Sequence, residues 1–127
     1  HTKFKVYDTV KKLSKDELHQ YLIFRSKMIL EEVGELIEAI DDKNPEEIVD
    51  ALIDNLVFTL GTLDLLEVDE EKAFNEVMSS NYRKEVGVKE GRPNPYGFPD
   101  MIKPEGWSGP DHSDNLGILL KAYPKGE

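Results

Sequence analysis

The chain has 127 residues, the size of one modest domain. Its 26 acidic residues outnumber its 16 basic ones and give a formal net charge of -10, so it is poorly suited to bind polymeric nucleic acid through backbone phosphates. The sequence contains no cysteine, which excludes disulfides, thiolate zinc sites and cysteine nucleophiles. We expect a single domain over residues 1–127, with a helical core over about 1–84 and an ordered loop or tail over about 85–127.

The sequence shows no feature that favours a membrane or secretory location. Its first residues carry no signal-peptide pattern. The longest apolar stretch, residues 51–66, is interrupted by Asp54, Asn55 and Asp64, and it is shorter than the ~20 residues that a bilayer span requires. We therefore expect a soluble, cytoplasmic protein without a membrane partner.

A strong start signal predicts a first long helix over residues 15–40. Ser14 and Glu17 have the spacing of a capping box, in which each side chain bonds to the backbone N–H of the other residue. Apolar residues then recur at helical spacing, at Leu18, Leu22, Ile29, Leu36 and Ile40.

A second helix is expected directly after a turn at residues 41–44. Asn44 is a favourable N-cap and Pro45 suits the first helical position. Gly61 weakens a helix by ~1 kcal/mol relative to alanine, and we expect close packing against another helix to account for it. The apolar positions of this helix are Ile48, Leu52, Ile53, Leu56, Val57, Leu60 and Leu63.

The remaining chain is predicted to hold one short helix and an irregular extension. Asp69 is a candidate cap for a third helix, and residues 81–113 contain five of the seven prolines and five of the nine glycines. The apolar segment 116–123 fits a short helix or a strand. The second helix is apolar around much of its circumference, which favours a covering partner subunit. We therefore predict an all-α, antiparallel helix bundle, built from a long helix hairpin and shorter helices, with a Pro/Gly-rich C-terminal extension and completed by oligomerisation.

The most informative feature of the sequence is a pair of acidic clusters on the two long helices. Residues 31–54 hold ten Asp or Glu residues and one Lys. Residues three and four apart share a helix face, so a hairpin brings together carboxylates from both helices. These residues are Glu32 and Glu35 on the first helix, and Glu47, Asp50 and Asp54 on the second.

Converging carboxylates repel one another unless a cation binds them, and their oxygen atoms suit Mg²⁺, or Mn²⁺ as a substitute. Such ions can bind a triphosphate and activate a water molecule for in-line attack. The alternative is an ordinary solvated acidic face on a non-catalytic helical interaction protein, since Glu47 is also explained by its place in the first turn. Asp54 lies among apolar neighbours, where a charge is costly to bury, and this favours a ligand or a hydrogen-bonded partner.

The ordered set of motifs resembles the all-α nucleoside triphosphate pyrophosphohydrolases, which include the MazG-like proteins, dimeric dUTPases and phosphoribosyl-ATP pyrophosphohydrolases. The similarity is greatest to small MazG-like proteins. It is carried by an E-E-x-x-E motif at 31–35, an E-x-x-D motif at 47–50, and the segments His1-Thr2-Lys3-Phe4, Asp50-Ala51-Leu52-Ile53-Asp54, Gly61-Thr62, Ala73-Phe74-Asn75-Glu76-Val77, Ser80-Asn81-Tyr82-Arg83-Lys84 and the loop 91–100.

The resemblance implies a role for each matched residue. Those implied to ligate Mg²⁺ are Glu32, Glu35, Glu47 and Asp50. Glu31 is implied to hold or polarise the attacking water or to ligate a further ion, and we assign catalytic roles to Glu31 and Glu35. The expected substrate-binding residues are Asp54, Asn81, Lys84, Arg92 and Tyr96, and in the loop either Lys89 or Arg92 can take the family's lysine position.

The resemblance also implies the reaction and the assembly. Family members hydrolyse a nucleoside or deoxynucleoside triphosphate to the monophosphate and pyrophosphate, and they form dimers or tetramers built from dimers. Phosphoribosyl-ATP pyrophosphohydrolase activity is the alternative within the family, although the long tail after Lys84 fits it poorly. Basic residues near the N-terminus (Lys3, Lys5 and Lys12) are hypothesised to offset substrate charge across a subunit boundary.

Overall fold

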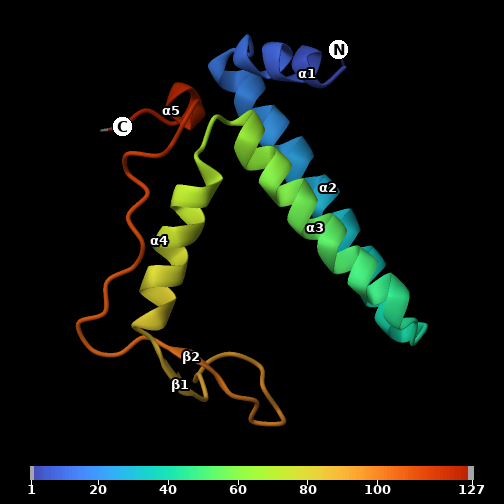
Figure 1. Cartoon of the computed structure of the whole chain (residues 1–127), viewed down its shortest axis with the longest axis vertical. Helices are drawn as coiled ribbons and strands as arrows, with labels where there is room; N and C mark the ends of the chain where they lie inside the picture. The colour runs from blue at the N-terminus through green and yellow to red at the C-terminus, as the bar shows by residue number, and fades with distance from the viewer. Residues whose placement is uncertain (1, 126–127) are drawn as a thin grey trace. The chain divides into compact units, whose positions relative to one another are not determined.

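The computed structural model describes residues 2–125, and for residues 2–5 it describes the backbone alone. The chain forms two compact units. The helical unit consists of His1–Glu70 and Leu116–Glu127. The second unit consists of Glu71–Asn115, and we call it the hairpin unit because it contains an antiparallel pair of strands. The elements, labelled in Figure 1, are α1 (Thr2–Lys11), α2 (Lys15–Asp41), α3 (Pro45–Leu65), α4 (Glu70–Tyr82), β1 (Glu85–Gly87), β2 (Asp100–Ile102) and α5 (Leu119–Ala122).

The two long helices begin where the local sequence signals place them. At the start of α2, Ser14 Oγ accepts the Glu17 N–H at 3.2 Å and Glu17 Oε1 accepts the Ser14 N–H at 3.0 Å. These bonds favour the charged carboxylate and lower the pKa of Glu17. At the start of α3, Asn44 Oδ1 accepts the Glu47 N–H at 3.2 Å, and Pro45 occupies the first helical position. Both predicted caps are confirmed, and the fold is all-α apart from one small sheet.

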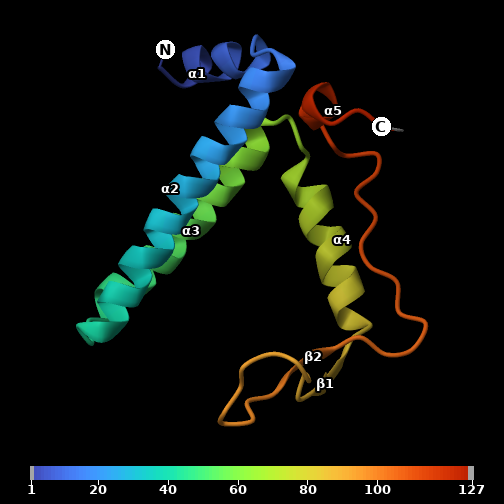
Figure 2. The ribbon, with the colours of Figure 1, turned by 180° about the vertical axis from the view of Figure 1, so that it is seen from behind.

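The helices α2 and α3 run side by side as an antiparallel hairpin, as Figures 1 and 2 both show. A polar contact joins the first half of α2 to the second half of α3. The Arg25 guanidinium lies 3.9 Å from the centroid of the Phe58 ring and donates to Thr62 Oγ1 at 2.8 and 3.0 Å. A Cβ built on Gly61 would lie 3.8 Å from Arg25 Nη2, which is an ordinary contact. Within this chain there is therefore room for a Cβ at Gly61, and the expectation that close packing accounts for this glycine stays a prediction.

One end of this hairpin, opposite the turn, holds most of the buried core. We call it the closed end, because α1 and α5 both pack there (Figure 1). Lys121 Nζ donates to the Lys11 carbonyl at 3.0 Å, and His19 Nδ1 lies 2.6 Å from the Tyr123 hydroxyl. The buried apolar residues there are Val10, Leu18, Leu65, Leu66, Val68 and Ala122. The helix α1 was not predicted, and α5 shows that the segment 116–123 contains a short helix.

The end of the hairpin near the turn, which we call the open end, exposes much of its apolar surface. Ala39 and Ala51 are buried between the helices. The large apolar residues exposed there are Leu30, Ile37, Ile40, Val49, Leu52, Ile53, Leu56 and Val57. Exposed apolar side chains that are contiguous on a surface are typical of interaction sites. Within residues 2–125 no helix is both long and apolar enough to cross a membrane.

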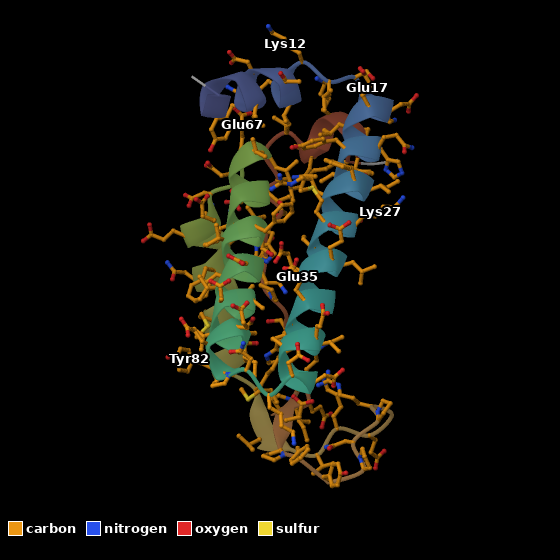
Figure 3. All side chains as sticks on the ribbon, turned by 90° about the vertical axis from the view of Figure 1, so that its right-hand side faces the viewer. Lys12, Glu17, Lys27, Glu35, Glu67 and Tyr82 are labelled. Carbon is orange, nitrogen blue, oxygen red and sulfur yellow. The ribbon has the colours of Figure 1, made fainter. Side chains whose placement is uncertain are left out.

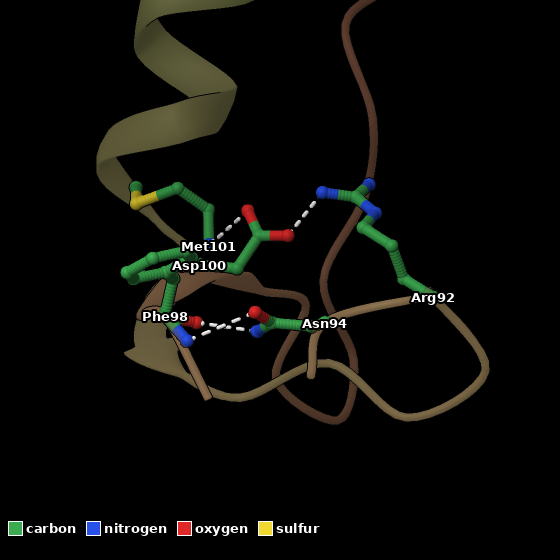
Figure 4. Close-up of polar contacts among 5 residues, drawn as sticks. All are labelled: Arg92, Asn94, Phe98, Asp100 and Met101. Atoms are coloured by element: carbon green, nitrogen blue, oxygen red, sulfur yellow. Dashed lines mark hydrogen bonds and ion pairs between the residues drawn. The ribbon is translucent and has the colours of Figure 1, made fainter. Parts of the chain in front are cut away.

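The hairpin unit contains α4 and a two-stranded antiparallel sheet that was expected to be irregular loop. Glu85 pairs with Ile102 and Gly87 with Asp100. Figure 4 shows the loop that joins the strands. Its Asn94 side chain donates to the Phe98 carbonyl at 2.8 Å and accepts the Phe98 N–H at 3.0 Å. These two bonds close a turn within this loop.

Candidate active site

A pocket of about 280 Å³ lies between α2 and α3 at the open end. Its base is formed by Ala39 and Ala51, which are only 7% and 5% exposed. Small side chains at these two positions leave room between the helices, and longer acidic side chains surround that room. The lining residues are Glu35, Glu38, Ala39, Asp42, Asn44, Glu47, Asp50, Ala51 and Asp54.

The structure brings four of the predicted site residues to this one pocket. They are Glu35 from α2 and Glu47, Asp50 and Asp54 from α3. Figure 3 labels Glu35 between the two helices. The helical spacing of the acids and the short turn at 42–44 together account for this arrangement, since each helix presents one acidic face to the other.

Glu32 does not line the pocket but is electrostatically linked to it. Its side chain is half-buried, and its Oε2 atom is buried without a hydrogen-bond partner. Burial raises the pKa of Glu32, and the neighbouring Glu35 carboxylate and then Asp54 and Glu31 raise it further. The Glu32 carboxylate therefore lies in a crowd of like charges, where a cation would be favourable.

Two acidic lining residues were not among the predicted site residues. Glu38 follows Glu35 by three residues on α2, and Asp42 is the C-cap of the same helix. Their spacing of three and four residues from Glu35 onward is the signal that could have found them. They extend the acidic surface of the pocket toward the turn.

The acidic side chains of the pocket offer the oxygen atoms that a hard cation prefers, but they do not converge closely on one point. Only carboxylate and amide side chains line it beside the two alanines, and Mg²⁺ and Mn²⁺ prefer oxygen ligands. The buried, unpartnered Oε2 of Glu32 is a further oxygen available to such an ion. However, no three acidic or histidine side chains of residues 2–125 are grouped closely enough to hold a metal ion. The assignment of Glu32, Glu35, Glu47 and Asp50 as ligands therefore stays a prediction.

A known protein family matches the part of the chain that contains this pocket. The family model for phosphoribosyl-ATP pyrophosphohydrolase matches residues 5–81. The chain belongs to the phosphoribosyl-ATP pyrophosphohydrolase family. The match to the all-α nucleotide pyrophosphohydrolases inferred from the motifs is thereby confirmed. Neither the curated proteins nor the solved structures contain a significant match to the chain.

The phosphoribosyl-ATP pyrophosphohydrolase match covers the acidic pocket but ends before the strands. It includes all of α2 and α3 and α4 almost to its last residue. The strands β1 and β2 and the segment that contains α5 follow it. The pocket is thus part of the family framework, whereas Lys84, Arg92 and Tyr96 lie beyond the matched residues.

The other predicted substrate-binding residues belong to the hairpin unit. Arg92 forms an ion pair with Asp100 (Figure 4). The Met101 backbone N–H, which donates to the Asp100 carboxylate, and the nearby Arg92 charge lower the pKa of Asp100. Tyr96 is 80% exposed, and the centroid of its ring lies 5.5 Å from the centroid of the Phe98 ring. Arg92 therefore has a structural partner already, and Tyr96 presents an open aromatic face.

The remaining predicted residues are less constrained by the structure. Asn81 is half-buried at the end of α4, and its carbonyl accepts the Lys84 N–H at 3.0 Å. Glu31 and Lys12 are exposed. His1 and the side chains of Lys3 and Lys5 lie outside the described residues.

Proposed function

We propose that the protein hydrolyses a nucleoside or deoxynucleoside triphosphate to the monophosphate and pyrophosphate, with Mg²⁺ as its cofactor. The observation that carries the proposal is the acidic pocket between α2 and α3, located inside the segment that the family model matches. Pyrophosphohydrolase activity is the property of the family. The triphosphate substrate and the metal are the finer parts of the proposal, and the motif resemblance supports them.

The chain's own residues would supply ligands, orientation and a proton acceptor. We assign the binding of Mg²⁺ to Glu32, Glu35, Glu47 and Asp50. When bound, the ion neutralises phosphate charge and lowers the barrier to attack on phosphorus. The carboxylate of Glu31 or Glu35 would orient a water molecule and accept its proton. The water oxygen bonds to the α-phosphorus, the bond from that phosphorus to the bridging oxygen breaks, and pyrophosphate leaves.

The rest of the nucleotide needs groups outside this acidic pocket. We assign sugar or phosphate contacts to Asn81 and Lys84 and further contacts to Asp54, Arg92 and Tyr96. The support is the motif resemblance, together with the positive charge of Lys84 and the open ring of Tyr96. Since Arg92 pairs with Asp100, its contact with substrate would require exchange of one anion for another.

Phosphoribosyl-ATP is the second candidate substrate, and the family description favours it. Its hydrolysis breaks the same kind of phosphate–phosphate linkage, so the carboxylates would have the same roles. The 34 residues between the end of the match and Asn115 are the reason to favour a triphosphate, because they supply aromatic and basic groups beyond the family framework.

We further propose that the active form is a homodimer or a tetramer built from dimers. The exposed apolar side chains of the open end support it. Val49, Ile53 and Val57 follow one another at intervals of four residues on α3, and each is at least half exposed. Replacing Val57 with Lys would put a charge in this strip and should lower the molar mass measured by light scattering. An unchanged mass would remove this strip from the interface.

A substrate panel tests the proposed function. Release of pyrophosphate should be measured with and without Mg²⁺ over the (d)NTPs and phosphoribosyl-ATP, with the wild type and Glu35→Gln in parallel. We expect Mg²⁺-dependent turnover of at least one triphosphate that the variant loses. Turnover of phosphoribosyl-ATP alone would support the second candidate.

The panel also separates the enzyme from a non-catalytic helical interaction protein. Binding of Mg²⁺ to the folded state alone raises the melting temperature. No turnover of any nucleotide, together with no such rise in the wild type, would contradict the enzyme and support the interaction protein.

A further inference from the structure

Two lysines face each other at one end of the small sheet. Lys84 directly precedes β1 and Lys103 directly follows β2. Because the strands are antiparallel and Glu85 pairs with Ile102, the two lysines flank the same end of the ladder. Like charges opposite each other destabilise a strand pair, so this arrangement is unfavourable unless something offsets it.

A single aromatic ring lies against both ammonium groups. The Nζ atoms of Lys84 and Lys103 are each 5.1 Å from the centroid of the Trp107 ring, within the range of a cation–π contact. The two charges are therefore separated by no more than twice that distance. The ring is itself held in place, because Trp107 Nε1 donates to the carbonyl of Ser80 at 2.8 Å and Ser80 is buried.

Unlike Lys72 and Arg92 of the same unit, these two lysines have no acidic partner in the described part of the chain. Lys72 pairs with Asp114 at 2.6 Å, and Arg92 pairs with Asp100. Neither Lys84 nor Lys103 forms an ion pair with any residue in the range 2–125. In a chain with 26 acidic residues, two neighbouring lysines without a carboxylate leave positive charge available to an external anion.

A third cation adds to this positive charge without neutralising it. Arg83 donates to the carbonyls of Ser79 and Ser108 at 3.2 and 3.3 Å. These neutral acceptors fix its guanidinium at the junction of α4 and β1. The junction therefore carries three positive side chains, all in the hairpin unit. Arg83 and Lys84 are consecutive in the sequence, and Lys103 lies at the same end of the strand pair as Lys84.

We propose that Lys84 and Lys103, positioned by Trp107, bind a diphosphate or triphosphate chain. Lysine ammonium groups bind phosphate as point charges, and two of them at one site suit an anion that carries charge on more than one phosphate group. The inference deepens the proposed function, because the anion would be the phosphate chain of the nucleotide or the pyrophosphate that it releases. Lys103 and Trp107 have no role in the motif resemblance.

The test can use Trp107 as its reporter, because it is the only tryptophan of the chain. Full-length protein treated with a chelator is titrated with inorganic pyrophosphate, inorganic phosphate and an uncharged nucleoside, and tryptophan fluorescence is followed. We expect saturable binding of pyrophosphate at least about tenfold tighter than that of phosphate, since each added charged hydrogen bond is worth that factor or more. The nucleoside should leave the signal unchanged.

Variants connect the signal to the lysine pair. Lys103→Gln should weaken pyrophosphate binding at least about tenfold. Lys27→Gln removes the same charge from an exposed position on α2 and should leave the affinity unchanged. Calorimetry repeats both measurements, because Lys103 adjoins the reporter ring. Trp107→Phe keeps a ring and should retain more affinity than Trp107→Ala, as a positioning role requires.

The inference and the proposed function fail in different ways. No saturable binding of pyrophosphate, or equal affinity in Lys103→Gln, overturns the anion site. If the wild type hydrolyses nucleotides, and Lys103→Gln changes neither the KM nor the inhibition of turnover by added pyrophosphate, the site is overturned while the function stands. If no nucleotide is hydrolysed but pyrophosphate binds and Lys103→Gln abolishes that binding, the site stands and the proposed function fails.

Discussion

The two ends of the α2–α3 hairpin differ in what surrounds them. At the closed end α1 and α5 cover the helices, and Leu18 is 0% exposed. At the open end only Ala39 and Ala51 are buried, and acidic side chains line the space between the helices. Burial of large apolar side chains stabilises a fold, whereas crowded carboxylates oppose it. Stability and the proposed chemistry therefore belong to opposite ends of the same pair of helices.

The largest effect is expected from removing a carboxylate at the open end. Glu35→Gln should lower kcat/KM at least about 100-fold, because it removes a proposed metal ligand and a proton acceptor while keeping the side-chain volume. Steady-state pyrophosphate release measures this loss. Circular dichroism should show an unchanged helix content.

The matched control is Glu46→Gln, because Glu46 is an exposed acid in the first turn of α3 that does not line the acidic pocket. Its activity should stay close to that of the wild type. Equal losses in the two variants would mean that general negative charge, and not the pocket, supports turnover.

At the closed end the largest expected effect is on stability. Leu18→Ala deletes a fully buried side chain and should lower the free energy of unfolding by about 3 kcal/mol. Urea unfolding followed by circular dichroism measures it. The control is Leu30→Ala, where the side chain is 69% exposed and a change below about 0.5 kcal/mol is expected for the monomer. A loss at Leu30 that grows with protein concentration would assign that residue to a subunit interface.

The long helices of this fold could be predicted because their signals are local. Ser14 with Glu17, and Asn44 with Pro45, specify each helix start within four residues of sequence. The helix α1 has one buried side chain among those described, Val10, and its contacts with the rest of the unit are long-range. Such contacts leave no periodic pattern in the sequence.

The candidate site shows the same division between local and long-range information. Spacing on the two helices correctly placed Glu35 and Asp50 on a common pocket. The small base of that pocket, Ala39 and Ala51, gave no chemical signal. The proximity of Lys84 and Lys103 depends on the pairing of β1 with β2. Each of these strands has three residues, which is too short for a strand pattern to be recognised in the sequence.

A smaller effect is expected where the C-terminal segment returns to the closed end. Gly117 has a φ of 53°, and a Cβ there would collide with the Leu66 carbonyl oxygen and lie 2.7 Å from the carbonyl carbon of Glu67. Gly117→Ala should therefore lower the free energy of unfolding by about 2 kcal/mol, as measured by urea unfolding. In contrast, Gly34→Ala on α2 has no atom within 4 Å of its new Cβ and should raise it by about 1 kcal/mol. Equal effects at the two glycines would contradict the close approach at Gly117.

The smallest expected effect is a pH-dependent change in stability at the open end, caused by Glu32. The raised pKa of Glu32 means that the folded state holds this proton more tightly than the unfolded state does. Its contribution to stability is therefore present below the ordinary glutamate pKa and is lost as pH rises through the raised value. Without metal, Glu32→Gln should melt above the wild type at pH 7, and the difference should disappear toward pH 4. Added Mg²⁺ should raise the melting temperature of the wild type more than that of the variant, because the cation offsets the repulsion that the variant lacks. A variant that melts below the wild type at pH 7 without metal would show that the Glu32 carboxylate stabilises the fold and is not strained by its acidic neighbours.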